Sequence, residues 1–271
     1  MPIFMDRHDL KGASATDVAD AHRKDLEIQD EYGVKFLTYW FDSNRGTAFC
    51  LIDSPDKETA QCVHREAHGH VFGDVVEVSL SAVEAFLGRI QDPPPQPGQQ
   101  PGNNLDGGRR VILFTDIVGS TEMTARLGDR LATELIRAHD SIVRRSLAAC
   151  DGREVKHTGD GIMASLPDST RGVECAIRIQ REFRHYNQES REPIHIRIGL
   201  DSGEPVEDSN DLFGATVQLA ARLCSEAAAD QILVSETVRT EHGDGALFKA
   251  AEQRQLKGFA GTVGVVECVW G

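Results

Sequence analysis

Two aspartates lie where their carboxylates could bind divalent cations. Asp116 follows residues 110–115, whose apolar pattern predicts a strand. Asp160 lies in a Gly-Asp-Gly sequence at the tip of a predicted hairpin, with arms over 153–158 and 162–166. Two acids on neighbouring strand ends could hold metal ions, and these would cancel the repulsion between an acidic protein and a triphosphate.

The small residues after Asp116 open a predicted helix. Main-chain N–H groups at a helix start can bind phosphate oxygens. The candidate phosphate-binding residues are Ile117, Val118, Gly119, Ser120 and Thr121.

Three more side chains extend this candidate site. Lys156 precedes Asp160 by four residues on one arm of the hairpin, and Gln218 and Arg222 are spaced i, i+4 on a predicted helix, so both leave the same face. Taken singly, an acid in a turn, a solvated lysine and a surface arginine are more often structural than functional. A functional interpretation therefore depends on all of these candidate residues occurring together.

The first 70 residues contain half of the histidines. His64 and His68 are spaced i, i+4 on a predicted helix, while His8 lies on a predicted strand and His22 on another helix. Imidazole-rich sites suit Ni²⁺, Zn²⁺ or Cu²⁺. Histidines that simply lie on or cap a helix are an equally good interpretation. The sequence HREAH over 64–68 is not the H-E-x-x-H of a metalloprotease.

Several common chemistries are absent or poorly supported. The chain has no Gly-Lys dipeptide, which excludes a Walker A loop, and no G-x-S-x-G elbow. Residues 159–164 match a relaxed G-x-G-x-x-A, but the segment that follows is β-like and reaches a proline at once. A dinucleotide-binding interpretation is therefore disfavoured.

Composition limits the partners. A formal net charge of −14 argues against broad binding to nucleic acid or to anionic membranes, because both are polyanions. No stretch approaches the roughly 18 apolar residues of a membrane span, and the N-terminal residues do not resemble a signal peptide. Six scattered cysteines without a C-x-x-C pair predict free thiols. We expect a cytoplasmic protein that does not bind a membrane.

The chain divides at one sharp change in composition. Residues 91–108 are rich in Pro, Gly, Gln and Asn, which predicts a linker between domains over 1–90 and 109–271. Both domains have strand and helix patterns in the order βαββαβ, which predicts an α+β protein with two ferredoxin-like sandwiches, the second with extra elements. The first is predicted from strands 2–8, 34–41, 47–52 and 75–78 and helices 14–32, 55–67 and 81–90. The second is predicted from strands 110–115, 153–158, 162–166, 194–200, 232–234 and 263–269 and helices through 131–147, 174–186 and 215–228.

From residue 110 to the C-terminus, the chain resembles the catalytic domain of class III nucleotidyl cyclases. The order and spacing of the similar segments also fit. These segments are FTDIVGST (114–121), EVKHTGDG (154–161), IRIGL (196–200), DLFG (211–214) and VQLAAR (217–222).

This resemblance implies a role for each matching residue. Asp116 and Asp160 would hold two Mg²⁺ or Mn²⁺ ions in each active site, while Lys156 and Asp211 would select adenine. The chemistry agrees, because lysine donates to a ring nitrogen and a carboxylate accepts from the 6-amino group of adenine. Guanine has a carbonyl oxygen in place of that amino group, so the carboxylate would face another acceptor. Arg222 would stabilise charge on the α-phosphate while the ribose 3′-oxygen attacks and pyrophosphate leaves. ATP would then give cyclic AMP.

Two residues depart from the family pattern. Gln218 replaces an asparagine that orients the ribose, and Phe259 replaces a lysine that binds the triphosphate. Lys257 is a candidate substitute, two residues away. A catalytically weak or inactive homologue that binds nucleotide or metal as a regulator is therefore the alternative hypothesis.

The resemblance further implies a homodimer, because in this family the metal-binding and base-selecting residues of one site come from different chains.

Most of residues 1–88 resembles a family of small ferredoxin-like nickel-binding proteins. The segments that carry this resemblance are MDRH (5–8), AH (21–22), TYW (38–40), FC (49–50) and HREAHG (64–69). It implies a site for Ni²⁺ or a similar ion, with the candidate ligands His8, His22, His64 and His68.

Overall fold

The computed structural model describes residues 1–69, 75–92, 106–204 and 214–271. It divides into an N-terminal unit, Met1–Arg109 with Glu204–Gly214, and a C-terminal unit, Arg110–Gly203 with Ala215–Gly271. Most of the predicted linker, and Asp211 of the predicted adenine site, lie outside the described residues.

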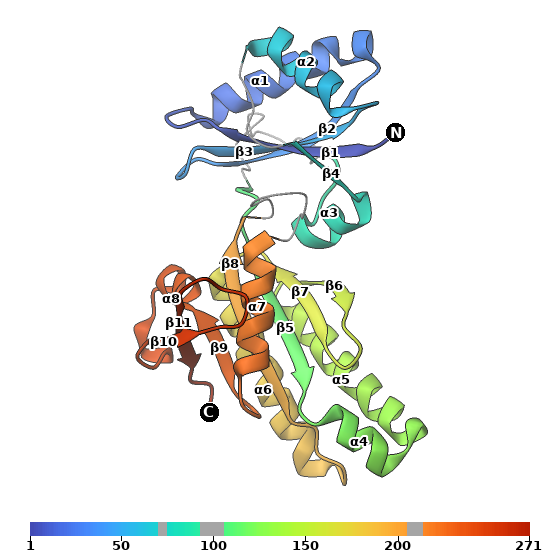
Figure 1. Ribbon diagram of the computed structural model, residues 1–271, viewed down its shortest axis with the longest axis vertical. Helices are drawn as coiled ribbons and strands as arrows, with labels where there is room; N and C mark the ends of the chain where they lie inside the picture. The colour runs from blue at the N-terminus through green and yellow to red at the C-terminus, as the bar shows by residue number, and fades with distance from the viewer. Residues whose placement is uncertain (70–74, 93–105, 205–213) are drawn as a thin grey trace. The chain divides into compact units, whose positions relative to one another are not determined.

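A four-stranded antiparallel sheet forms the N-terminal unit, with strand order β2-β3-β1-β4. Its elements are β1 (Ile3–Asp9), α1 (Ala15–Ile28), the 3-10 helix η1 (Gln29–Tyr32), β2 (Lys35–Asp42), β3 (Thr47–Asp53), α2 (Lys57–His68), β4 (Val75–Val78) and α3 (Leu80–Leu87). Helices α1 and α2 lie together on one face of this sheet (Figure 1). Apolar residues such as Phe36, Ile52 and Val63 fill the layer between these helices and the sheet.

Seven strands form the sheet of the C-terminal unit, in the order β10-β11-β9-β8-β5-β7-β6. Its elements are β5 (Arg110–Ile117), α4 (Ser120–Leu127), α5 (Asp129–Ala149), β6 (Arg153–His157), β7 (Ile162–Leu166), α6 (Ser169–Glu189), β8 (Ile196–Gly203), α7 (Gly214–Glu226), β9 (Ile232–Ser235), α8 (Glu236–His242), η2 (Gly245–Leu247), β10 (Glu252–Gln255) and β11 (Thr262–Cys268). The main core includes Leu113 of β5, Ile142 of α5 and Phe183 of α6.

Two glycines allow α7 to lie directly on β8 (Figure 1). A Cβ atom at Gly199 would lie 2.1 Å from the backbone nitrogen of Cys224, and one at Gly203 would lie 1.9 Å from Thr216 Oγ1. Side chains at these positions would force the helix away from the sheet, since protein interiors are close-packed. The glycines therefore set the position of α7, which carries Gln218 and Arg222.

The observed elements follow the predicted order, with differences that have local causes. The predicted helix over 14–32 is α1 followed by η1. Helix α6 begins before the predicted residue 174, because the Asp168 side chain caps it by accepting from the backbone N–H of Arg171 at 2.8 Å. The helix predicted to open after Asp116 is α4, which ends at Leu127 before α5 begins, while α8 and β10 had no prediction.

All six cysteines are free thiols, and five of them are buried. None of the helices in the described part of the chain combines the length and the apolarity that crossing a membrane requires.

Candidate active site and metal-binding cluster

Asp116 lies near the end of β5, directly opposite Arg197 on β8. The Arg197 Nε and Nη2 atoms lie 2.7 and 2.6 Å from Asp116 Oδ2. Arg197 Nη1 also donates to the main-chain carbonyl of Ser225, near the end of α7, at 2.8 Å. One guanidinium therefore joins the carboxylate to the helix that carries Arg222. Sequence reasoning assigned no role to Arg197, although it lies in the IRIGL segment.

Asp160 lies in the connection between β6 and β7, next to the end of β5. Its main-chain carbonyl accepts from the N–H of Ile117 at 3.3 Å, and its carboxylate accepts from the Ser120 hydroxyl. A Cβ atom at residue 161 would lie 1.9 Å from the Thr115 carbonyl oxygen, so only glycine fits there. This close approach brings the two aspartates together.

The pKa of the Asp116 carboxyl reflects its closeness to a second acid, Asp160. Burial raises the pKa of its carboxyl, and the neighbouring Asp160 carboxylate raises it further, so the pKa stays above its ordinary value although Arg197 lowers it. Like charges held this close favour binding of cations between them.

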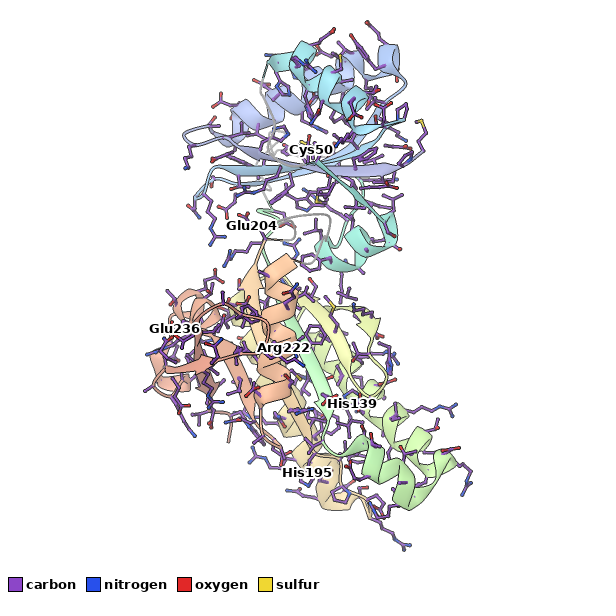
Figure 2. The ribbon with its side chains drawn as sticks, viewed as in Figure 1. Cys50, His139, His195, Glu204, Arg222 and Glu236 are labelled. Carbon is purple, nitrogen blue, oxygen red and sulfur yellow. The ribbon has the colours of Figure 1, made fainter. Side chains whose placement is uncertain are left out.

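Behind these aspartates lies a polar network that sequence reasoning missed. His139, which Figure 2 labels, belongs to α5 and is fully buried. Its Nε2 lies 3.2 Å from Thr115 Oγ1, and its Nδ1 lies 3.1 Å from Asp140 Oδ1. Asp140 also contacts His157 Nε2 at 3.0 Å, and His157 Nδ1 accepts from the Gly159 N–H at 3.3 Å. Burial lowers the pKa of His139. The network links the residue before Asp116 to the connection that carries Asp160.

Two backbone N–H groups of the predicted phosphate-binding segment already form hydrogen bonds within the protein. The N–H groups of Ile117 and Val118 donate to the carbonyls of Asp160 and His195, the latter at 2.9 Å. The phosphate-binding hypothesis therefore narrows to the first turn of α4, which begins at Ser120 after Gly119.

The other predicted residues lie on separate elements. Lys156 is exposed on β6, and Lys257 is exposed in the turn after β10. Gln218 and Arg222 lie one turn apart on α7, with Gln218 exposed and Arg222 half-buried. Figure 2 labels Arg222 on this helix. Phe259 packs against an apolar cluster that includes Leu223 and Val265, so its side chain contributes to the core.

In the N-terminal unit, three of the four predicted histidine ligands lie together. Asp6, His8, Cys50 and His64 form one cluster of potential metal ligands, and Asp25, His64 and His68 form a second. His22 belongs to neither cluster found in the described residues. Its Nε2 lies 3.0 Å from Asp92 Oδ2, and its ring packs against Tyr39.

The charges of the first cluster are strongly coupled. Burial opposes ionisation of Asp6, yet His8 and His64 hold the pKa of that carboxyl well below its usual range. Burial alone would lower the pKa of His8, but the Asp6 carboxylate raises it to about 10. The donor set combines two imidazoles, a carboxylate and a thiol, and it suits a transition metal such as nickel or zinc.

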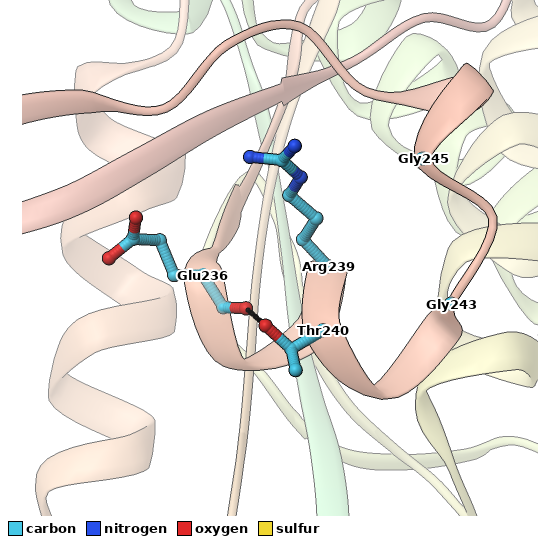
Figure 3. A pocket seen from close by; sticks show the side chains of 5 residues that line it. All are labelled: Glu236, Arg239, Thr240, Gly243 and Gly245. Carbon is cyan, nitrogen blue, oxygen red and sulfur yellow. Dashed lines mark hydrogen bonds between the residues drawn. The ribbon is translucent and has the colours of Figure 1, made fainter.

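A surface pocket in the C-terminal unit lies at α8. It is lined by Glu236, Arg239, Thr240, Gly243 and Gly245, and Figure 3 shows the Arg239 side chain extending from the helix. None of the predicted site residues that the structure describes lines this pocket.

The family model of the adenylate and guanylate cyclase catalytic domain matches residues 108–269, more than half of the chain. The chain belongs to this family. The family model described as nickel responsive protein SCO4226-like matches residues 4–78 of the same chain.

Curated relatives are similar to the cyclase domain. An adenylate cyclase from Streptomyces coelicolor is 31% identical over 133 residues, which is 49% of this chain and 34% of that protein. A pH-sensitive adenylate cyclase from Mycobacterium tuberculosis is 29% identical over 171 residues, which is 60% of this chain and 41% of that protein. The chain thus spans well under two thirds of the length of either relative.

Solved structures share the fold. An adenylate/guanylate cyclase/hydrolase from Silicibacter pomeroyi is 25% identical with a TM-score of 0.53, over 59% of this chain and 96% of that one. The adenylyl cyclase CyaB from P. aeruginosa is 23% identical with a TM-score of 0.51, over 59% and 93%.

Proposed function

We propose that this protein is an adenylate cyclase that converts ATP to 3′,5′-cyclic AMP and pyrophosphate. The observation that carries the proposal is the pairing of Asp116 with Asp160 at the ends of adjacent strands, where the Asp160 carboxylate raises the pKa of the Asp116 carboxyl. Carboxylate oxygens are the ligands that Mg²⁺ and Mn²⁺ prefer. The two aspartates would hold two such ions, which would supply charge neutralisation for the triphosphate and activation of the ribose 3′-oxygen.

Other residues would bind and orient the nucleotide. The first turn of α4, with Gly119, Ser120 and Thr121, would contact phosphate oxygens, since the N-terminus of a helix favours anions. Lys156 and Asp211 would recognise adenine, and Lys257 would contact the triphosphate. A lysine donor and a carboxylate acceptor match the hydrogen-bonding edge of adenine and mismatch guanine.

The remaining roles are assigned to α7. Arg222 would stabilise the charge that develops on the α-phosphate, and Gln218 would orient the ribose. We propose that these residues act across a twofold homodimer, so that each site takes its aspartates from one copy and Arg222 from the other. Both domains would be ferredoxin-like sandwiches, the second with the additional strands of a cyclase.

The decisive pair of variants tests the carboxylates. Purified protein with ATP and Mn²⁺ or Mg²⁺ should form cyclic AMP, and Asp160→Asn should reduce the rate by about 1,000-fold or more, because one metal-binding carboxylate is lost. Glu134→Gln, which removes an exposed carboxylate on α5, is the matched control and should keep the wild-type rate.

The alternative function is a regulator that binds nucleotide without turnover, and Gln218 and Phe259 are the residues that favour it. It predicts ATP binding but no product with either metal. If Gln218→Asn combined with Phe259→Lys then restored cyclic AMP formation, the wild-type chain would be the regulator.

We also propose that the N-terminal unit binds Ni²⁺ or a similar ion through the predicted histidines and changes the cyclase rate. The proximity of His8, His64 and His68 supports a metal site. Equal rates with and without Ni²⁺, in protein shown to bind it, would rule out the regulatory role.

A further inference from the structure

Four potential metal ligands from three elements meet in the interior of the N-terminal unit. Asp6, His8, Cys50 and His64 are only 1%, 3%, 6% and 1% exposed. One donor atom from each lies within 4.8 Å of the others. Ligands about 2.0–2.3 Å from a tetrahedral ion are roughly 3.3–3.8 Å apart, so a small adjustment of side chains would bring all four onto one ion.

The register of the sheet explains why these groups meet. Asp6 of β1 and Cys50 of β3 are directly opposite each other, and His8 follows Asp6 by two residues on the same face. The Cys50 N–H donates to Asp6 Oδ1 at 3.1 Å. The other carboxylate oxygen, Asp6 Oδ2, lies 3.2 Å from His8 Nε2 and 2.9 Å from His64 Nε2.

Asp25 of α1 holds His64 in the orientation that such a site requires. Its Oδ1 lies 3.0 Å from His64 Nδ1, while His64 Nε2 is directed to Asp6. Histidines that bind metals usually donate their other ring N–H to a carboxylate, which fixes the tautomer and the ring. His68 Nε2 lies 3.3 Å from the same Asp25 oxygen, on the far side of the His64 ring from Asp6.

A buried ion-pair cluster without metal is the competing explanation, in which the Asp6 carboxylate and a Cys50 thiolate would balance two protonated imidazoles. Only the metal site would bind one Co²⁺ through the thiolate, so the two explanations predict different results in a cobalt titration. A thiol placed opposite the carboxylate adds the soft donor that distinguishes sites for zinc, cobalt and nickel from sites for magnesium.

We propose that Asp6, His8, Cys50 and His64 bind one transition-metal ion of the zinc, cobalt or nickel class, and that Asp25 is the positioning residue for His64. This inference rests on the proposed metal-binding role of the N-terminal unit but gives it a different ligand set, with a thiolate and a carboxylate and without His22 or His68. The thiolate would disfavour Mg²⁺, which prefers oxygen ligands, so Mg²⁺ used for catalysis would not compete for this site.

Cobalt titration of the metal-free, reduced full-length chain tests the ligand set. A cobalt–thiolate bond gives an intense charge-transfer absorption band in the near ultraviolet, which oxygen and nitrogen ligands do not produce. We expect this band to saturate at one Co²⁺ per chain. Cys50→Ser should abolish it, whereas the matched control Cys62→Ser, which removes the half-buried thiol of α2, should retain it.

Two further variants distinguish this ligand set from the histidine set. His22→Gln should leave the band and the cobalt affinity unchanged. Asp25→Asn should keep the band but weaken cobalt binding by about 10- to 100-fold, because it removes only the partner that orients His64. Circular dichroism of each variant checks that it is folded, and the wild-type spectrum tests the thiolate ligand without relying on any variant.

The possible results separate this inference from the proposed function. Cobalt binding to wild-type protein without the thiolate band would overturn the ligand set but leave metal binding by the N-terminal unit intact. Failure of wild-type protein to bind cobalt in the N-terminal unit would overturn both, while cyclic AMP formation would stand. Loss of the band in Cys50→Ser but not in Cys62→Ser would support the inference.

Discussion

Arg197 and Asp116 form a two-atom contact across neighbouring strands, with the guanidinium Nε and Nη2 at 2.7 and 2.6 Å from a single carboxylate oxygen. The contact places a fixed positive charge beside the aspartate pair. If cations occupied the aspartates, the same guanidinium would be available to contact phosphate oxygens, because its planar set of donors suits them.

Arg197→Gln should therefore raise the KM for ATP by about tenfold to a hundredfold, the effect of losing one charge-assisted contact. Initial rates at varied ATP and saturating Mn²⁺ measure this. Arg126→Gln is the control, because Arg126 is 61% exposed and forms its ion pair with Glu192, a residue with no assigned role in the site. If Arg197→Gln tightened metal binding and left KM unchanged, Arg197 would serve only to neutralise Asp116.

Gly161→Ala should greatly reduce activity while the chain remains folded. The new methyl group would lie 1.9 Å from the Thr115 carbonyl oxygen, so the connection that carries Asp160 must move. A displacement of about 1 Å in an active site lowers a rate roughly 100-fold. Gly245→Ala, where no heavy atom lies within 4 Å of the added carbon, should keep the wild-type rate. A wild-type rate for Gly161→Ala would refute the positioning role of this glycine.

Two inactive variants should restore activity when mixed, if each site is shared between chains. Asp160→Asn lacks a proposed metal ligand, and Arg222→Ala lacks the charge that we propose stabilises the α-phosphate. In a twofold dimer with random exchange, about a quarter of the sites in an equal mixture would have both residues intact. Cyclic AMP formation after mixing measures this recovery. Mixed dimers that form without recovery would mean that each chain builds its own site.

The metal-free N-terminal unit should lose stability as the pH rises from neutral to alkaline. His8 has a folded pKa of about 10, against an ordinary value of 6.5. The stabilisation from its proton is fully present below pH 6.5 and is lost as the pH rises through 10, at up to about 1.4 kcal/mol per pH unit for one proton.

Urea unfolding with a chelator, followed by Trp40 fluorescence in a Trp270→Phe background, measures this dependence. Trp40 and Trp270 are the two tryptophans of the chain, so the signal reports on the N-terminal unit alone. His8→Gln should reduce the slope of the unfolding free energy against pH. An unchanged slope would show that His8 carries no such proton.

Local sequence patterns were sufficient to predict most of the helices and strands. The predicted strand 75–78 has the bounds of β4, and the predicted strand 110–115 lies within β5. Alternating or continuous apolar residues and turn-forming residues decide these elements locally. The spacing of His64 and His68 likewise predicted their proximity, because it depends on a single helix.

Contacts between distant segments could not be predicted in this way. Arg197 meets Asp116 because of the register between β8 and β5, and Cys50 meets Asp6 because of the register between β3 and β1. Neither register can be read from one strand alone. His139 looked like an ordinary helix residue, since its partner Thr115 lies 24 residues away.

The most direct test of the central claim is a competition between the two purine nucleotides. Wild-type protein is incubated with equal concentrations of ATP and GTP and with Mn²⁺, and both cyclic products are quantified over time, with Asp160→Asn as the blank. We expect cyclic AMP as the main product and none above background in the blank. Predominant cyclic GMP, or no cyclic nucleotide from a folded protein that binds ATP, would contradict the proposed adenylate cyclase activity.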